Sequence, residues 1–200
     1  MKLNIVIVGV GGQGALTTAA ILARAAMKAE NNVLTAETHG MAQRGGSVEV
    51  HVRIGEVYSP LVPEGDADLL IALEPVEALR YAKYLSEKSI VVLNTRKIIP
   101  PSVTTGIARY PEIEEIISDI SKICKVHALN ITEIAEKAGS IQATNVAIIG
   151  ATFAIYPMPF SYEDLEWAVK YVIPENLHEI NLKALRMGYE KVKLNQPAGE

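Results

Sequence analysis

The sequence predicts an α/β fold. We expect a mostly parallel sheet with flanking helices in a Rossmann-like three-layer arrangement, a hairpin insertion after the second strand, and a helical C-terminal region. Strand-like and helix-like segments alternate through the first two thirds of the chain, which favours parallel strands joined by crossover helices. The chain has 200 residues, 49% of them hydrophobic and 21% charged, enough to bury one large core. We expect a single domain over residues 1–195 and a frayed tail at 196–200.

The first strand and helix meet at a glycine-rich turn. Residues 3–8 are continuously apolar, as expected for a central strand covered on both faces. Residues 12–29 are rich in helix formers. One side of this predicted helix carries Leu16, Ala20, Ala23 and Met27. A turn at residues 31–32 then leads into a second short strand at 33–36.

The next segment has the period-two pattern of a strand. Apolar Val48, Val50, Val52 and Ile54 alternate with polar Glu49, His51 and Arg53. This alternation predicts a strand with one wet face and favours antiparallel pairing. Residues 55–58 are expected to turn the chain back as a hairpin before Pro60 and Pro63 end it.

The remaining segments alternate strands and helices and then become helical. Buried strands are predicted at 67–73 and 89–94, and a further strand at 125–129. Helices are predicted at 75–85, 112–120, 131–138 and 144–154. Another helix should follow Ser161, because an acidic side chain three residues later completes a capping box. The last helix is expected from about 174 to 194.

Composition narrows the class of protein. Nineteen basic against 23 acidic residues give a net charge of −4, and no dense run of Lys and Arg suggests nucleic-acid binding. No segment reaches the roughly 18 apolar residues of a membrane span, and the first residues lack a signal-peptide pattern. The only cysteine, Cys124, permits no internal disulfide and no iron–sulfur ligation by this chain alone. We expect a soluble, cytoplasmic protein in which Cys124 is a small core residue.

Glycines at 9, 11 and 14 have the spacing of a dinucleotide-binding fingerprint between a strand and a helix. Such a turn lets the backbone approach a ligand closely, and its N–H groups and the helix dipole attract phosphate. The plain alternative is that the glycines only permit a tight turn and close helix packing. Glu37 lies where an acid would hold a ribose hydroxyl.

The segment after the second strand argues against an NAD(P)-binding oxidoreductase. A dinucleotide fold needs a third parallel strand reached through another crossover helix. Residues 37–46 carry no helical periodicity and are interrupted by Gly40, Gly45 and Gly46. The predicted hairpin follows instead, so the second half of the nucleotide-binding unit is missing.

Three segments carry a resemblance to a known family. Residues 9–14 read GVGGQG, residues 39–48 read HGMAQRGGSV, and residues 144–151 read TNVAIIGA. Together they resemble the gamma-type domain of 2-oxoacid:ferredoxin oxidoreductases over essentially the whole chain. The loop at 39–46 is similar to that of the aryl-pyruvate (indolepyruvate) branch, which corresponds to a small, or beta, subunit.

The resemblance implies coenzyme A-dependent oxidative decarboxylation of a 2-oxoacid, with electrons passing to ferredoxin. Thiamine diphosphate, Mg and 4Fe-4S clusters would reside on a larger, alpha partner subunit. This chain has one cysteine and no Gly-Asp-Gly segment of the kind that holds magnesium and thiamine diphosphate. Its own contribution would come from its glycine-rich loops, with coenzyme A as the ligand and no metal.

The candidate site residues follow from these segments. The predicted catalytic residues are His39, Gln43 and Arg44, which add an imidazole, an amide and a fixed cation. The predicted cofactor-binding residues are Gly9, Gly11, Gly12, Gln13, Gly14, Gly45, Gly46 and Asn145.

Plain alternatives stay open for several of these residues. Arg44 could bridge to a carboxylate across a subunit interface, and His39 could be a hydrogen-bonded loop residue. Asn145 could cap a helix or fix a turn, and Glu37 could anchor the loop. At the level of function, the rivals are a non-catalytic assembly subunit of the same complex and, less favoured, an NAD(P)-binding oxidoreductase. The preferred oxoacid and the stoichiometry stay open.

Overall fold

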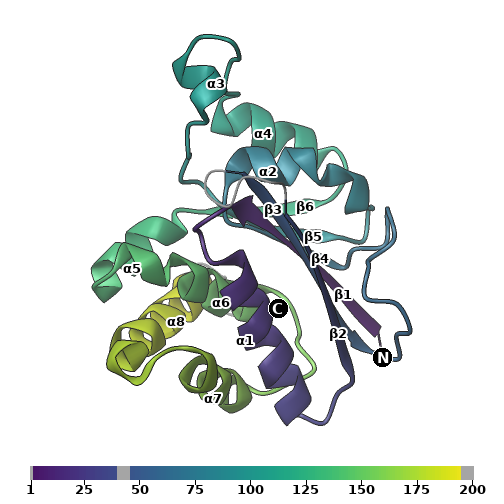
Figure 1. Ribbon diagram of the computed structural model, residues 1–200, viewed down its shortest axis with the longest axis vertical. Coiled ribbons are helices and arrows are strands. Elements are labelled where there is room, and N and C mark those ends of the chain that lie inside the picture. Colours follow the sequence, from purple (N-terminus) through teal and green to yellow (C-terminus); the bar gives the residue numbers. More distant parts are fainter. Residues whose placement is uncertain (1, 40–45, 195–200) are drawn as a thin grey trace.

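A six-stranded sheet lies at the centre of the protein (Figure 1). The computed structural model describes residues 2–39 and 46–194. The strand order is β2-β3-β1-β4-β5-β6. The strands are β1 (Lys2–Val10), β2 (Val33–His39), β3 (Ser47–Gly55), β4 (Leu69–Ala72), β5 (Ile90–Asn94) and β6 (Lys125–Leu129).

The sheet is parallel on one side of β1 and antiparallel on the other. The parallel pairs are β1 with β4, β4 with β5, and β5 with β6. β3 lies between β1 and β2 and is antiparallel to both. The expectation of a mostly parallel sheet with an antiparallel feature is confirmed. Because the strand after β2 runs antiparallel to it, the third parallel strand of a dinucleotide-binding unit is missing here.

Helices cover both faces of the sheet. They are α1 (Ala15–Lys28), α2 (Pro75–Arg80), α3 (Pro101–Thr104), α4 (Ile113–Ser121), α5 (Ile131–Ala138), α6 (Thr144–Ile155), α7 (Tyr162–Val172) and α8 (His178–Lys193). Short 3-10 turns η1 (Ala82–Tyr84), η2 (Ile141–Ala143) and η3 (Glu175–Leu177) adjoin them. Figure 1 shows α1 and α5 to α8 on one face, α2 and α4 on the other, and α3 projecting from the body. Within the described ranges, no helix combines the length and apolarity needed to cross a membrane.

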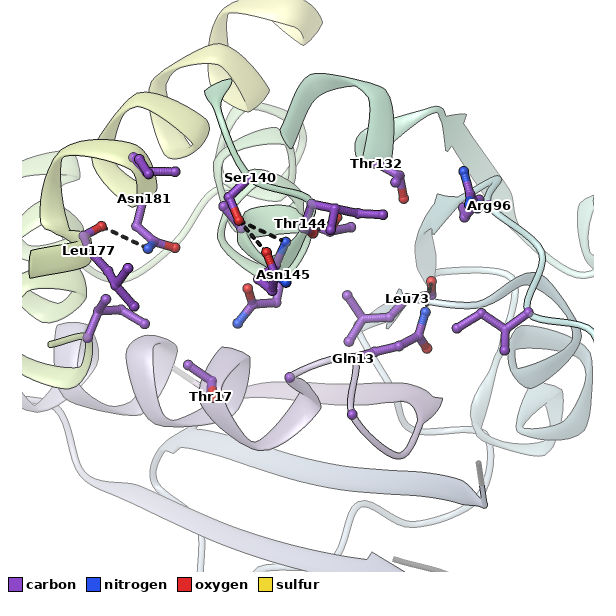
Figure 2. A pocket seen from close by; sticks show the side chains of 18 residues that line it. Gln13, Thr17, Leu73, Arg96, Thr132, Ser140, Thr144, Asn145, Leu177 and Asn181 are labelled. Atoms are coloured by element: carbon purple, nitrogen blue, oxygen red, sulfur yellow. Dashed lines mark hydrogen bonds between the residues drawn. The ribbon is translucent and has the colours of Figure 1, made fainter. Parts of the chain in front are cut away.

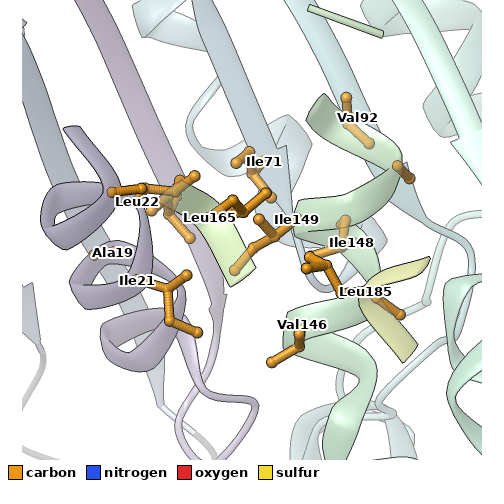
Figure 3. Close-up of a cluster of buried hydrophobic side chains, with 14 of the residues drawn as sticks. Ala19, Ile21, Leu22, Ile71, Val92, Val146, Ile148, Ile149, Leu165 and Leu185 are labelled. Atoms are coloured by element: carbon orange, nitrogen blue, oxygen red, sulfur yellow. The ribbon is translucent and has the colours of Figure 1, made fainter. Parts of the chain in front are cut away.

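Two hydrophobic cores result, one on each face of the sheet. The larger packs β1, β3 and β4 against α1 and α6 to α8, with Ile149 and Leu165 near its centre (Figure 3). The smaller packs the opposite face against α2 and α4 and includes Ile116. Cys124 lies in the smaller core, and burial raises the pKa of its thiol. The expectation of a buried cysteine is therefore confirmed.

Local sequence signals predicted the helix ends well. α5 begins after Asn130, whose side chain accepts a hydrogen bond from the N–H of Glu133, and it ends at Gly139. α7 begins after Ser161, which forms the expected capping box with Asp164. Each of these signals acts within one turn of the helix, so it does not depend on the rest of the fold.

The predicted hairpin at residues 55–58 is wrong. The hairpin is formed by β2 and β3, and no strand occurs between Gly55 and β4. Both edges of β3 are already paired, one with β1 and one with β2. A returning strand would therefore find no free edge, and Tyr58 is instead almost fully exposed.

The prediction of a wet face on β3 is also wrong. Glu49, His51 and Arg53 are all buried. His51 pairs with Glu49 through its Nε2 at 2.7 Å, and Arg53 donates from Nε to Asn4 Oδ1 at 2.9 Å. The segment after β3 covers this face, where the N–H of Val62 donates to His51 Nδ1 at 3.1 Å. The alternation marks one apolar and one hydrogen-bonded buried face.

Two long side chains of α1, Leu16 and Met27, do not face the core. Leu16 is 46% exposed and Met27 is 51% exposed. Ile21 and Leu22 pack into the larger core in their place. The exposed side of α1 borders a shallow groove along the edge strand β2, which Glu37 also lines.

One histidine on the edge strand β6 should make stability depend on pH. Nε2 of His127 is buried without a hydrogen-bond partner in the described part of the chain. Desolvation, and then the charge of Lys125, lower the pKa of His127 below its usual 6.5. The unfolded chain takes up this proton more readily than the folded one. The contribution of neutral His127 to stability is therefore fully present above the usual pKa of 6.5, and it is lost as the pH falls through the lowered pKa.

We expect the free energy of unfolding to fall between about pH 7 and pH 5, and His127→Leu to flatten that fall. Urea denaturation at a series of pH values measures both profiles. Parallel profiles for the variant and the wild type would contradict the assignment.

Candidate functional site

A cavity of about 580 Å³ opens where the carboxyl ends of the parallel strands meet (Figure 2). This edge of an open α/β sheet is where such folds usually bind ligands. Its walls are the glycine turn before α1, the segments that follow β4 and β5, the starts of α5 and α6, and the region before and within α8. The lining residues are Gly12, Gln13, Gly14, Thr17, Leu73, Arg96, Ile98, Thr132, Ser140, Ile141, Gln142, Ala143, Thr144, Asn145, Ile173, Leu177, Ile180 and Asn181.

The glycine turn uses part of its hydrogen-bonding capacity internally. The N–H of Gly11 donates to the carbonyl of Gly46 at 2.8 Å, and the N–H of Gln13 donates to the carbonyl of Val10 at 3.0 Å. The first of these bonds joins the turn directly to the end of the second glycine-rich segment. The structure thus brings together two segments that the sequence singled out separately. It also leaves fewer turn donors for a ligand than the sequence pattern implies.

Gln13 ties two strand ends together. Its Oε1 accepts from the N–H of Val10 at 2.7 Å, and its Nε2 donates to the carbonyl of Leu73 at 2.9 Å. A Cβ at Gly9 would lie 2.9 Å from that Oε1 and 3.1 Å from the Cβ of Leu73, so Gly9 leaves room for both side chains. The side chain therefore shapes the cavity floor, and its predicted contact with a ligand stays a prediction.

Gly14 and Asn145 lie in direct contact. Gly14 has a φ of 84°, in the left-handed region, and a Cβ there would lie 2.7 Å from Asn145 Nδ2. Only glycine meets both conditions without strain. The N-cap of α6 is Ala143, so Asn145 is not the capping residue that the alternative reading allowed. It packs on the glycine turn and lines the cavity.

Two helices begin at the cavity without a cap. α1 and α6 have no side-chain cap and no acidic residue in the first turn. By contrast, the starts of α2, α5 and α7 are capped by side chains. The start of α6 is not free, because α6 continues the turn η2, which Ser140 caps, and the N–H of Thr144 donates to the carbonyl of Ile141. The start of α1 and the positive end of its dipole border the cavity through Gly14 and Thr17 and suit an anionic group.

The sequence reasoning missed Asn94, which is fully buried at the end of β5. Its Nδ2 donates to the carbonyl of Leu73 at 3.1 Å and to Thr132 Oγ1 at 3.0 Å. Its Oδ1 accepts from the N–H groups of Ile131 at 3.1 Å and Thr132 at 3.3 Å. Together with Gln13, Asn94 joins the ends of β1, β4 and β5 to the start of α5. A single amide ending an apolar strand at this edge was the available signal.

The described lining of the cavity carries no side chain suited to general acid–base catalysis. Among the lining residues within the described ranges, only Arg96 is charged, and none is a histidine, a cysteine or a carboxylate. General acid–base catalysis requires a group that titrates near the working pH, and an arginine does not. Across residues 2–39 and 46–194 there is also no group of three or more potential metal-binding side chains. The cavity can position a ligand, whereas a proton-transfer group would have to come from outside its lining.

The predicted catalytic residues are only partly covered by the structure. His39 is the last residue of β2, paired with Val48, and nothing is described of its side chain. Gln43, Arg44 and Gly45 lie outside the described residues. Glu37 lines the separate groove beside α1, away from the cavity. The catalytic roles of His39, Gln43 and Arg44 therefore stay predictions.

Ser47, Glu77 and Tyr81 form a hydrogen-bonded cluster that does not belong to the described lining of the cavity. Ser47 Oγ donates to Glu77 and is 2.8 Å from Tyr81 Oη. Desolvation raises the pKa of Glu77, against the opposing effects of Ser47 and Arg80. The cluster fixes the start of β3 against α2.

The protein resembles known proteins both in sequence and in structure. Residues 4–191 match the family described as pyruvate ferredoxin/flavodoxin oxidoreductase. An indolepyruvate oxidoreductase subunit, IorB, of Archaeoglobus fulgidus is 61% identical over 199 residues, which cover 99% of each chain.

Two solved structures share the fold. The gamma subunit of a keto/oxoacid ferredoxin oxidoreductase from Geobacter sulfurreducens has a TM-score of 0.71 at 26% identity, covering 96% of this chain and 99% of that one. A 2-oxoglutarate:ferredoxin oxidoreductase chain from Magnetococcus marinus, solved with 2-oxoglutarate, coenzyme A and succinyl-CoA bound, has a TM-score of 0.75 at 19% identity. The match covers 98% of this chain and 32% of that longer one, so there the same fold is one part of a larger polypeptide.

Proposed function

We propose that this chain, which belongs to the pyruvate ferredoxin/flavodoxin oxidoreductase family, is the small subunit of an indolepyruvate ferredoxin oxidoreductase. The observation that carries the proposal is the identity to the Archaeoglobus subunit along the whole of both chains. The loop at residues 39–46, which is similar to the aryl-pyruvate branch, supports the same substrate class.

The proposed reaction converts a 2-oxoacid and coenzyme A into an acyl-CoA thioester and CO2. The carboxylate leaves as CO2, the carbonyl carbon forms a bond to the sulfur of coenzyme A, and the thiol proton is released. The electron pair lost in this oxidation passes to ferredoxin. Thiamine diphosphate, when bound to the partner, would stabilise the carbanion that decarboxylation leaves.

The residues of this chain do not fit the redox cofactors. An iron–sulfur cluster needs several cysteine thiolates, and the single Cys124 is buried in the smaller core. We therefore assign thiamine diphosphate, Mg and the 4Fe-4S clusters to a larger alpha subunit, which also passes electrons to ferredoxin. A cytoplasmic complex follows from the same proposal, because thiolate-held clusters need a reducing compartment.

We assign coenzyme A to the cavity at the carboxyl edge of the sheet. Its volume lies within the range of pockets that bind small molecules. The uncapped start of α1 suits a phosphate group, and aliphatic side chains such as Ile173 and Leu177 suit the uncharged arm. In this proposal Gly12, Gly14 and Asn145 contact the ligand, and Gln13 holds the cavity floor.

The loop that includes His39, Gln43 and Arg44 would face the partner subunit and help orient the oxoacid or the incoming thioester. This assignment rests on the residue types and the family resemblance. A non-catalytic assembly role makes a different prediction: loop substitutions would weaken association with the partner, while intact complexes would turn over normally.

Anaerobic co-expression with the candidate large subunit tests the function. The purified complex is assayed for ferredoxin reduction with indolepyruvate, phenylpyruvate and pyruvate. We expect the highest kcat/KM with indolepyruvate and the lowest with pyruvate. A complex that assembles and contains its clusters, yet reduces ferredoxin with none of the three acids, would overturn the proposal. A preference for pyruvate would overturn the substrate assignment alone.

A further inference from the structure

The two ends of the cavity differ in chemistry. Figure 2 shows Arg96 and Thr132 on one side of the opening and Leu177 and Asn181 on the opposite side. Ile173 and Ile180 join Leu177 in an aliphatic wall at the second end. One end of the cavity therefore carries a cation, and the other carries an aliphatic wall beside the amide of Asn181.

Arg96 is a cation without a carboxylate partner. It follows β5 and lines the cavity, and no carboxylate in the described ranges forms a salt bridge with it. The neighbouring Lys97 is engaged elsewhere: its Nζ is 2.8 Å from Glu112 and lies over the Tyr110 ring. Two adjacent cations thus have different environments, and only Arg96 is available to a ligand in the cavity.

The backbone at the same end is already hydrogen-bonded. The N–H groups of Ile131 and Thr132, at the start of α5, donate to Asn94, and the side chain of Asn130 caps the same helix. The start of α5 therefore leaves few donors for an anion at this end. Arginine offers several N–H donors in a planar fork that matches a phosphate. An anionic group here would be held by Arg96.

We propose that Arg96 is a specificity-determining residue that binds a phosphate group of coenzyme A. The uncharged pantetheine arm runs toward the apolar wall of Ile173, Leu177 and Ile180. This inference rests on the proposed function and adds the orientation in which coenzyme A would lie in the cavity.

The test compares Arg96→Gln, Arg96→Lys and the matched control Lys97→Gln in the assembled complex. Coenzyme A and pantetheine, which lacks every phosphate, serve as acyl acceptors, and calorimetry gives the Kd of coenzyme A without turnover. Loss of a charge-assisted hydrogen bond should raise the KM and the Kd for coenzyme A about tenfold in Arg96→Gln. The kcat/KM for pantetheine and the KM for the oxoacid should stay unchanged.

Arg96→Lys should recover part of the affinity, because it keeps the charge but loses the fork, and Lys97→Gln should behave as the wild type. Equal losses for coenzyme A and pantetheine would overturn the proposal, as would an unchanged Kd in Arg96→Gln. Either result would leave the proposed function intact, since that function fails only if the wild-type complex does not reduce ferredoxin.

Discussion

Gly150→Ala is expected to destabilise the protein by roughly 3 kcal/mol or more. A Cβ at Gly150 would lie 2.0 Å from the carbonyl oxygen of Leu185, and a Cβ at Gly188 would lie 2.0 Å from that of Ala147. The two glycines let α6 and α8 cross with their backbones in contact. Overpacking a core usually costs about 1–3 kcal/mol, and here the obstructing atom belongs to a backbone that cannot rotate away.

This loss is large against the roughly 5–15 kcal/mol that stabilise a typical domain. The displacement of α6 would also disturb the cavity, because Asn145, in the first turn of α6, packs on Gly14. We expect the variant to unfold at a much lower urea concentration than the wild type, or to accumulate as aggregated protein.

Equilibrium urea denaturation of the wild type and Gly150→Ala measures the loss. Lys183→Ala is the matched control, since Lys183 is exposed on α8 and surface substitutions usually change stability by less than about 0.5 kcal/mol. If Gly150→Ala were as stable as this control, the close crossing of α6 and α8 would be wrong.

Asn94→Leu is expected to destabilise the protein by about 2–4 kcal/mol, the second large effect. The amide of Asn94 satisfies the carbonyl of Leu73 and the N–H groups of Ile131 and Thr132. Leucine has a similar size but no hydrogen-bonding group. Each buried group left without a partner costs about 1–3 kcal/mol, and Gln13 still supplies one hydrogen bond to the Leu73 carbonyl.

Asn130→Ala provides the comparison, because it removes the other side-chain cap of α5 at an exposed position. Loss of an ordinary N-cap costs about 1 kcal/mol. Thermal or urea unfolding should therefore place Asn94→Leu well below Asn130→Ala in stability. The reverse order would show that Asn94 does not hold the strand ends and α5 together.

Local patterns in the sequence predicted the elements whose signals are themselves local. The bounds of α5 and the capping box of α7 depend on residues within one helical turn. The polar face of β3 could not be predicted in this way. Alternation shows that the two faces of a strand differ, but whether His51 meets water depends on the chain segment that covers it.

The same limit applies to the site. The sequence predicted Gly14 from the spacing of the glycines and Asn145 from a family resemblance, and their contact exists only because α6 packs beside the glycine turn. Asn94 was missed because its partners, Leu73 and Thr132, lie on other elements. Arg96 belongs to none of the sequence motifs, and its proposed role in binding follows from the cavity that it lines.

Ferredoxin reduction by the complex with indolepyruvate, measured with and without coenzyme A and with and without this chain, tests whether this chain is a working subunit of the enzyme. We expect rapid reduction and acyl-CoA formation only when both are present. If the large subunit formed acyl-CoA at the same rate without this chain, the proposed role of this chain would be wrong.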